Sequence, residues 1–475
     1  HFRPSTCYIN NFKSLQEGGK RIMAKAKTTL TFYGGVGEVG GNKILLKDKN
    51  TSIFLDFGMP FSIRSKYYSG PFLAPRSEKS LIELGILPKI RGLYKDSKET
   101  SIDAVFISHS HLDHSAYISF IKDTIEIHVG KTTELILEAI SETRKRDLEL
   151  NFNLEKRRNE EKIKNFRTGS KIKIGSVEVE PVHVDHSVPG AYGFIVHTSS
   201  GTVVYTGDFR MHGAKYRMSM EFIEKAAEAE PVALITEATN LTGAHYSSER
   251  EVEAKLTQII SQCSGLVLAD FARADVDRFR SFYNAAKKNG RILAISLKQA
   301  YLLKELEEDK RLKIPHLNDE NIAIFRKKKG RYYDWEKEIL RKYEDKEKVI
   351  DAKAVGRNGN RYVLALSFYD FEELIDIRPP PGSCYILSAS EPFNEEMEID
   401  FERLKNWLEH YGLPQYHVHV SGHIMPLQLK KAIEEINPKM VFPVHTEHPE
   451  LFKKFLEDLP AKIVIPEKER KYSLG

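Results

Sequence analysis

Apolar and polar positions alternate along the chain in short runs that predict β-strands, and longer segments with helical spacing separate these runs. The N-terminal part begins with three strand-like runs, TTLTFYGG, KILLK and SIFLDFG, each bounded by glycine or charged residues. Further on, GLVLADFARADVDRFRSFYNAAKKNGRILAI has the pattern of a strand, a helix and a second strand within one βαβ unit. This order predicts an α/β fold with a second, parallel sheet in the later part of the chain.

Length and composition are typical of a globular protein with two or three domains. The 475 residues are 41% hydrophobic and 29% charged, and 72 Lys plus Arg against 67 Asp plus Glu mildly favour an anionic partner. No apolar run reaches the roughly 18 residues of a membrane span, so no membrane partner is expected. Three widely spaced cysteines indicate no disulfide framework and predict a reducing, cytoplasmic setting. Residues 1–28 are expected to form an N-terminal arm, either native or carried over from cloning, without a functional role.

The stretch ISHSHLDHSAY concentrates side chains of the metal-ligand type. It places His109, His111, Asp113 and His114 within six positions, directly after the predicted strand AVFISH. A loop that curls from a strand into a helix can direct several of these side chains to one place. Imidazole nitrogen and carboxylate oxygen are the ligands that zinc and manganese accept. The spacing therefore predicts two divalent metal ions held side by side.

Other predicted strand ends offer further ligands for such a site. Asp208, in VVYTGDFRMHG, is a candidate to bridge the two ions, because a carboxylate can bind one ion with each oxygen. In VHVDHSVPG, the residues alone do not decide between His183, Asp185 and His186. Asp56 in SIFLDFG is expected to orient a ligand imidazole rather than to bind metal.

The glycines of FYGGVGEVGGN, residues 32–42, have the spacing of a dinucleotide-binding loop. A helix should follow such a loop, but the strand-like KILLK follows here. The stretch is therefore interpreted as a β-hairpin.

The order Asp56, His109 to His114, His186 and Asp208 resembles the metallo-β-lactamase superfamily. LITEATN with Glu237, VSGH with His423 and PVHTE with His445 are similar to the additional motifs of its β-CASP nucleases. GGVGEVGGN, HSVPGAYGFIVHTSSGTVVYTGDF and HVSGH resemble the RNase J family in an archaeal-type short form, from about residue 30 to 455. The resemblance implies a metallo-β-lactamase αββα sandwich with an inserted Rossmann-like β-CASP domain. We expect the sandwich from residues 29–242 and 416–475, and the insert from residues 243–415.

The resemblance also implies roles for individual residues. One metal ion would be held by His109, His111, His186 and Asp208, and the second by Asp113, His114, Asp208 and His445. Zinc is expected, with manganese as the alternative. Glu237 would hydrogen-bond a ligand histidine, and His423 would contact the scissile phosphate without binding metal, so that Asp56, Asp113, Glu237 and His423 form the catalytic set. The RNA phosphates would contact His419, Ser421, Gly422, Ser247, Ser248, Arg273 and Arg278.

The implied activity is hydrolysis of single-stranded RNA in RNA decay and processing. A 5′-to-3′ exonuclease that favours 5′-monophosphate RNA is expected, acting as a homodimer, and a β-CASP endoribonuclease is the alternative. A small-molecule metallo-hydrolase would not need the long segment between Asp208 and His445. A catalytically silent RNA-binding subunit would be expected to lack ligands that are all present here.

Overall fold

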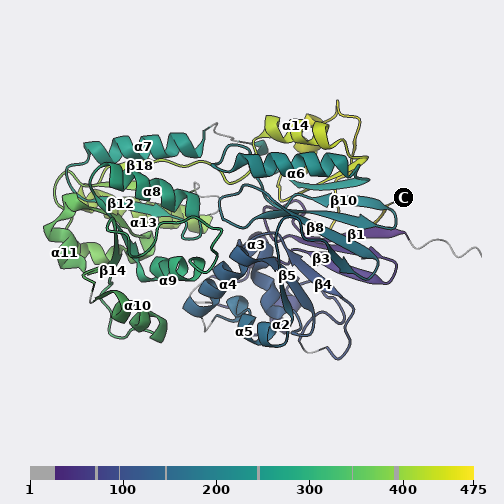
Figure 1. Ribbon diagram of the computed structural model, residues 1–475, viewed down its shortest axis with the longest axis horizontal. Helices are drawn as coiled ribbons and strands as arrows, with labels where there is room; N and C mark the ends of the chain where they lie inside the picture. The colour runs from purple at the N-terminus through teal and green to yellow at the C-terminus, as the bar shows by residue number, and fades with distance from the viewer. Residues whose placement is uncertain are drawn as a thin grey trace, which may run out of the picture.

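The computed structural model describes residues 27–69, 73–95, 97–144, 147–242, 247–344, 346–389 and 395–474. The described residues form three sheets in two lobes (Figure 1). The first sheet has the order β21 (Lys471–Leu474), β1 (Thr28–Gly34), β2 (Lys43–Asp48), β3 (Thr51–Leu55), β4 (Ala104–Ile107), β5 (Glu126–Gly130) and β6 (Ile163–Phe166). The antiparallel pairing of β1 with β2 confirms the expected hairpin.

The second sheet faces the first. Its order is β20 (Lys462–Ile463), β19 (Met440–Val444), β11 (Ala233–Glu237), β10 (Gly201–Tyr205), β9 (Tyr192–Thr198), β8 (Val177–His183) and β7 (Ile172–Ile174). Phe106 of the first sheet and Phe194 of the second pack edge to face, with ring centroids 5.9 Å apart. Both belong to one core of fully buried residues drawn from the two sheets.

Helices cover the outer face of each of these two sheets. The first sheet is covered by α1 (Phe61–Arg64), α2 (Glu78–Glu83), α3 (Leu112–Ser115), α4 (Lys131–Thr143) and α5 (Leu154–Asn159), together with the 3₁₀ turns η1 (Ala116–Phe120) and η2 (Leu148–Leu150). The second is covered by α6 (Tyr216–Glu228), α14 (Pro426–Ile436) and α15 (Pro449–Phe455). This arrangement confirms the expected αββα sandwich.

The third sheet forms the other lobe. Its order is β15 (Val349–Ile350), β14 (Ile322–Phe325), β13 (Ile292–Ser296), β16 (Tyr362–Ala365), β12 (Val267–Phe271), β17 (Cys384–Ser388) and β18 (Gln415–His417), and every neighbouring pair is parallel. The predicted βαβ unit is β12, α8 (Val276–Lys288) and β13, with β16 lying between its two strands. The sheet ends at His417, two residues beyond the expected boundary of the insert.

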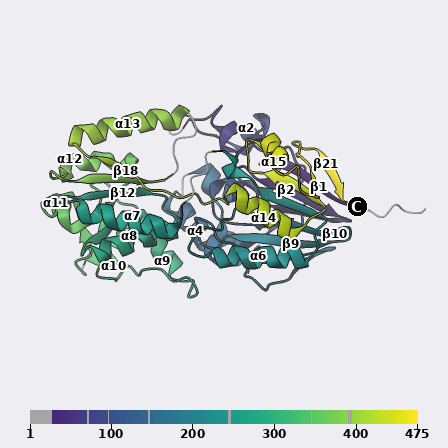
Figure 2. The ribbon, with the colours of Figure 1, turned by 90° about the horizontal axis from the view of Figure 1, so that it is seen from above.

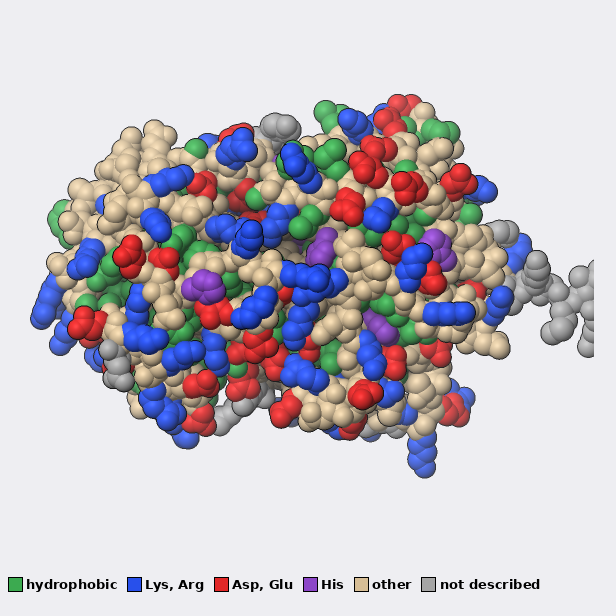
Figure 3. All heavy atoms as spheres, in the orientation of Figure 1, with side chains coloured by type: hydrophobic (Ala, Val, Ile, Leu, Met, Phe, Trp, Pro, Cys, Tyr) green, Lys and Arg blue, Asp and Glu red, His purple; other side chains and the backbone are tan. Residues whose placement is uncertain are grey.

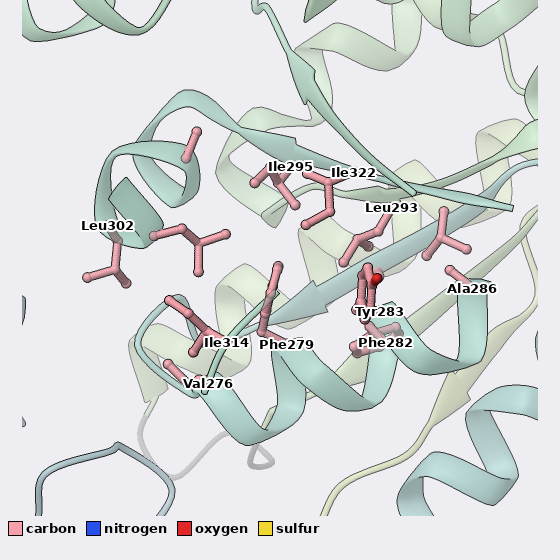
Figure 4. Packing of buried hydrophobic residues seen from close by; sticks show 14 of the residues in the cluster. Val276, Phe279, Phe282, Tyr283, Ala286, Leu293, Ile295, Leu302, Ile314 and Ile322 are labelled. Carbon is pink, nitrogen blue, oxygen red and sulfur yellow. The ribbon is translucent and has the colours of Figure 1, made fainter. Parts of the chain in front are cut away.

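Helices lie on both faces of the third sheet, as a parallel sheet requires. One face is covered by α7 (Glu249–Gln262), α8, α9 (Leu297–Leu306) and α10 (Asp334–Glu344). The other is covered by α11 (Ala352–Arg357), α12 (Leu374–Ile377) and α13 (Glu395–Tyr411), with η4 (Gly359–Arg361) and η5 (Phe368–Glu373) between strands (Figure 2). Figure 4 shows Phe279 and Phe282 of α8 directed toward Leu293, Ile295 and Ile322 of the sheet. This lobe is the expected Rossmann-like insert.

The two lobes share a core through α4. Leu135, Ile136 and Ala139 of this helix are buried in the same hydrophobic cluster as the inner faces of α8 and α9. Leu137, on another side of α4, belongs to the core outside the first sheet. The boundary between the lobes is therefore packed like a protein interior.

The state of the cysteines and the hydrophobicity of the helices bear on two expectations from composition. Cys263 and Cys384 are free and buried, whereas Cys7 lies outside the described residues. Among the helices described, none is both long and apolar enough to cross a membrane.

Candidate metal centre

The loop after β4 carries four candidate ligands and packs against a glycine-rich connection. Asn42 donates its backbone N–H to the carbonyl oxygen of Asp113 at 3.0 Å. An added Cβ at Gly58 would lie only 1.6 Å from that carbonyl oxygen, and one at Gly40 would lie 2.7 Å from Asp113 Oδ2. Gly40 also has a φ of +83°, which side chains rarely adopt. Glycine at these two positions lets the backbone approach the loop closely.

Four side chains from three strand ends form a first group of possible ligands. His109 Nε2 and His186 Nε2 lie 3.1 and 3.0 Å from His111 Nδ1. Asp208 Oδ2 lies 3.6 Å from His109 Nε2 and 3.9 Å from His186 Nε2. The four ligand atoms all lie within 4.8 Å of one another. This is the set that the family resemblance implies for one metal ion.

Asp113, His114 and His445 form the second group, again with ligand atoms within 4.8 Å of one another. His445 Nε2 lies 3.0 Å from Asp113 Oδ2. Asp208 lies between the two groups, because its Oδ2 is 3.1 Å from His114 Nε2 and 3.6 Å from His445 Nε2. The geometry places Asp208 where a bridging carboxylate is expected.

The structure distinguishes His186 from His183 and Asp185, the two neighbours that the sequence alone could not exclude as metal ligands. Asp185 accepts from Arg210 Nε at 3.2 Å, and His183 Nδ1 lies 2.9 Å from Thr168 Oγ1. Neither belongs to a ligand group within the described part of the chain. His186 is held by its other nitrogen, because Nδ1 donates to the Gly422 carbonyl at 2.6 Å and leaves Nε2 directed toward the group.

The polar atoms at the centre fit a bound cation. Both oxygens of Asp208 and His114 Nε2 are buried and have no hydrogen-bond partner among the described residues. His114 Nδ1 donates to Asp56 Oδ2, so Nε2 faces the Asp208 carboxylate. Burial opposes protonation, but the charges of Asp208, Asp113 and Asp56 raise the pKa of His114, so Nε2 holds a proton unless a metal ion takes its place. A proton or a metal ion can satisfy these buried atoms, and the donor set of histidine and aspartate suits a divalent metal ion.

Burial and mutual repulsion keep the imidazoles of the first group in the neutral form that metal binding needs. Burial is the largest cause that lowers the pKa of His109 and His186, and neighbouring histidines lower both further. Burial likewise lowers the pKa of His111 to about 4, against the opposing charges of Asp113 and Asp208. The first group therefore offers three unprotonated nitrogens near neutral pH.

Asp56 has the position predicted for a residue that orients a ligand. In addition to His114, it accepts from the backbone N–H of Ser108 and the hydroxyl of Tyr205, at 2.7 and 2.6 Å. Asp56 and His445 both have positive φ, +59° and +55°, which is uncommon for residues with a side chain. Such backbone conformations are found where the surrounding structure fixes a functional side chain.

The expected direct contact between Glu237 and a ligand histidine is not seen. Glu237 Oε2 instead lies 3.0 Å from His423 Nδ1 and accepts from the Thr239 hydroxyl at 2.7 Å. Thr239 Oγ1 in turn lies 2.9 Å from His445 Nδ1, so Glu237 reaches the ligand histidine through Thr239. The residue that the sequence reasoning missed is thus Thr239, the third residue of the same EATN motif.

His423 lies beside the second group. Its Nδ1 is 3.8 Å from Asp208 Oδ2, and a third cluster of possible ligands consists of Asp208, His423 and His445. The hydrogen bond between His423 Nδ1 and Glu237 occupies this nitrogen, and the His423 side chain keeps 20% of its surface exposed. The expectation that His423 contacts substrate instead of metal stays a prediction.

The HVSGH loop lies at the edge of the centre but is already engaged in contacts within the protein. The Ser421 hydroxyl accepts from Asn240 Nδ2 at 3.0 Å and from the backbone N–H of His423 at 3.1 Å. An added Cβ at Gly422 would lie 3.0 Å from His186 Cε1, so this glycine is needed for close approach. Burial and the charge of Arg278 lower the pKa of His419 to about 3.

Arg278 is not exposed to a phosphate in this conformation. Its side chain has no accessible surface, pairs with Glu249 at 3.0 Å and donates to the Ser388 hydroxyl at 2.5 Å. Ser248 caps α7 by accepting from Glu251 N, and the Ser247 hydroxyl lies 3.4 Å from Glu251 Oε2. The expected phosphate contact by Arg278 is therefore replaced by an ion pair within the fold.

Arg273 differs from Arg278 because it is only partly buried. Burial and the nearby positive charge of Arg144 lower its pKa to about 10. No ion pair to Arg273 is formed among the residues that the structure describes. A contact between Arg273 and RNA phosphate stays a prediction.

Comparisons with known proteins agree with this geometry. A family model described as "Beta-lactamase superfamily domain" matches residues 88–232. The chain is 23% identical over 439 residues to a Ribonuclease J of Mycoplasma genitalium, a match that covers 90% of this chain and 69% of that protein. It is 26% identical over 464 residues to a Ribonuclease J of Thermus thermophilus, covering 93% of this chain and 73% of that protein.

A solved structure shows the same fold. It is a crystal structure of a protein of unknown function from Enterococcus faecalis V583, with a TM-score of 0.74 and 24% identity, and it covers 94% of this chain and 100% of that one. Over about nine tenths of its length the chain is therefore similar to ribonuclease J proteins, and residues 88–232 match a beta-lactamase superfamily domain.

Proposed function

We propose that the chain hydrolyses phosphodiester bonds of single-stranded RNA and uses two divalent metal ions. The observation that carries this proposal is the position of Asp208 between two ligand groups, with both carboxylate oxygens buried and without a hydrogen-bond partner among the described residues. His109, His111, His186 and Asp208 would hold one ion, and Asp113, His114, Asp208 and His445 the other. Bound there, the ions would lower the pKa of water and neutralise charge on a phosphodiester.

The residues around the centre have distinct tasks in this proposal. Asp56 fixes the orientation of His114, and Thr239 fixes that of His445 by placing its hydroxyl beside Nδ1. Both contacts leave the Nε2 atoms directed toward the centre. A ligand set that is already ordered loses little conformational entropy when it binds an ion.

His423 is the candidate proton donor. Burial opposes its protonation, but the charges of Glu237 and Asp208 outweigh burial and raise the pKa of His423 to about 9. Glu237 is itself fixed by the backbone N–H of Phe209 at 3.0 Å. A protonated His423 with partly exposed surface can donate to a phosphate oxygen or to the departing 3′ oxygen.

The finer proposal is a 5′-to-3′ exonuclease that favours a 5′-monophosphate, with zinc or manganese as the metal. Its support is the likeness of HYSSER and HVSGH to the RNase J family, together with Arg273 as a cation without an acidic partner among the described residues. The enclosure of Arg278 means that a terminal phosphate would contact other groups. A homodimer and a cytoplasmic setting belong to the same proposal.

A time course on one internally labelled RNA with a 5′-monophosphate, 5′-triphosphate or 5′-hydroxyl end tests the function. Zinc or manganese is added, and Asp208→Asn serves as the inactive control. Immediate release of mononucleotides from the monophosphate RNA supports the exonuclease. Internal fragments that do not depend on the 5′ end support the endonuclease alternative. Absence of cleavage with either metal would overturn the ribonuclease proposal in favour of a small-molecule hydrolase or a silent subunit.

A further inference from the structure

A cavity lies between the two lobes, beside the loop that carries His186. It has a volume of about 440 Å³, and residues 183–190 after β8 line one side. Residues 309–313, between α9 and β14 of the other lobe, line the opposite side. His186 lines the cavity and also belongs to the first ligand group, so the cavity lies directly beside the metal centre. On the face that Figure 3 presents, Lys and Arg side chains gather in the middle, where the lobes meet.

The acidic side chains around this cavity are already paired. Asp309 accepts from Thr132 at 2.6 Å and from Arg167 at 2.8 Å, which links the lobes at one wall of the cavity. Asp185 and Asp277 both bind the guanidinium of Arg210, at 3.2 and 3.1 Å. Their negative charges are therefore balanced within the fold.

Three cations at the cavity are not balanced in this way. Lys215, Arg311 and Lys313 line it, and none has an ion-pair partner among the residues that the structure describes. Their influence is visible at His183, which also lines the cavity. Burial and the charges of Arg167, Lys215 and Arg311 lower its pKa to about 4, against the opposing charge of Asp309. The cavity therefore has a positive potential.

The loop that carries Arg311 and Lys313 is held in place. Ile314 is buried against α8, and Figure 4 shows it beside Val276 and Phe279. The backbone N–H of Leu312 donates to the Asp309 carbonyl at 2.9 Å, and Arg280 Nη2 donates to the Lys313 carbonyl at 2.5 Å. Arg311 and Lys313 therefore project from an ordered loop, which reduces the conformational entropy lost when a ligand binds.

We propose that this cavity binds a phosphate group outside the metal centre, carried either by an RNA strand or by a free nucleotide. The volume is that of a small-ligand site, and phosphate is the anion that two or three converging Lys and Arg side chains recognise. The RNA source rests on the proposed function, because the strand would extend from the centre across the boundary between the lobes. The nucleotide source does not depend on cleavage.

Equilibrium binding to the full, metal-loaded chain tests the proposal. The ligands are 5′-AMP and an uncleaved 2′-O-methyl RNA of about 12 nucleotides, long enough to cover several phosphate sites. The variant Arg311→Glu/Lys313→Glu removes two exposed cations of the cavity. Lys353→Glu/Arg357→Glu is the matched control, because it makes the same charge change on exposed positions of α11. Lys215→Gln gives a second, milder change on the other lobe.

An RNA affinity that falls about tenfold in the cavity variants but not in the control would support the proposal with RNA as the source. The slope of log affinity against log salt should then decrease by about 0.7 for each phosphate that the variant no longer neutralises. A comparable weakening for 5′-AMP alone would support it with a free nucleotide as the source. If both ligands bind the cavity variants as they bind the control, the proposal is overturned. Because binding is measured, this result is distinct from a wild-type chain that fails to cleave RNA.

Discussion

Asp56 and His114 form a 2.7 Å hydrogen bond in a place where neither side chain has any exposed surface. Asp56→Asn keeps the shape of the side chain but weakens the charge that holds the Nδ1 proton of His114. We expect the affinity for divalent metal to fall about 10- to 100-fold, as measured by competition with a chelator. Asp103→Asn is the control, because this exposed carboxylate accepts a backbone N–H from Ser52 outside the centre. Equal affinities in wild type and Asp56→Asn would refute the orienting role.

Thr239→Val should reduce turnover without unfolding the chain. The valine removes the hydroxyl that connects Glu237 to His445, so the imidazole loses the partner of its Nδ1. We expect cleavage of RNA to slow by about tenfold, with a smaller loss of metal. Thr239→Ser retains the hydroxyl and should restore most of the rate. A serine variant as slow as the valine variant would show that packing of the methyl group matters instead.

His423→Ala and His445→Ala should have different effects although their rings lie 5.2 Å apart. His445 belongs to the second ligand group, so its alanine variant should lose close to one bound ion per chain by elemental analysis. His423→Ala should keep the metal content and lose cleavage by about 100-fold or more, the range for a general acid. Loss of metal from His423→Ala would assign this residue to the third possible ligand cluster.

Gly58→Ala should be strongly destabilising. The added methyl group would overlap the backbone of Asp113 and His114, so the metal loop would have to move. We expect the free energy of unfolding to fall by about 3 kcal/mol in urea titrations. Gly330→Ala is the matched control, since no atom lies within 4 Å of its added Cβ. A difference between the two variants below about 0.5 kcal/mol would contradict the predicted clash.

Asp270 at the end of β12 predicts a pH dependence of stability. Burial raises its pKa to about 6, although Phe368 N and the Tyr385 hydroxyl donate to it. The protonated form is favoured in the folded state, so stability is lost as pH rises from the unfolded value near 3.8 through about 6. Asp270→Asn avoids this loss. Its free energy of unfolding relative to wild type should therefore rise by about 2 kcal/mol as pH increases from about 4 to about 8.

Urea unfolding at several pH values measures this difference. The exposed Asp376→Asn substitution is the control and should change stability by less than about 0.5 kcal/mol throughout. A gain for Asp270→Asn that is the same at low and high pH would mean that proton binding is not its cause.

Local patterns were sufficient to predict much of this protein. The strand ends near His111, His186 and Asp208 were visible because apolar runs stop shortly before each group of polar residues, although the choice of His186 over His183 and Asp185 came from the family resemblance. The parallel sheet of the insert followed from one βαβ pattern. Each of these features depends on residues close together in the chain.

The features that the sequence did not reveal depend on contacts between distant segments. The burial of Arg278 results from Glu249 and Ser388, which lie on other elements. The role of Thr239 becomes visible only when β11 pairs with β19 and brings His445 next to it. The interposition of β16 between β12 and β13 is likewise a property of the whole sheet.

Helix α4 has a mechanical consequence because its buried residues are divided between two hydrophobic cores. A helix anchored on two sides cannot shift without opening a void in one core, and each void costs about 1 kcal/mol per methyl-sized gap. The arrangement of the two lobes on either side of α4 is thus set when the chain folds. If the proposed function holds, this rigidity would limit the space available to an RNA strand between the lobes.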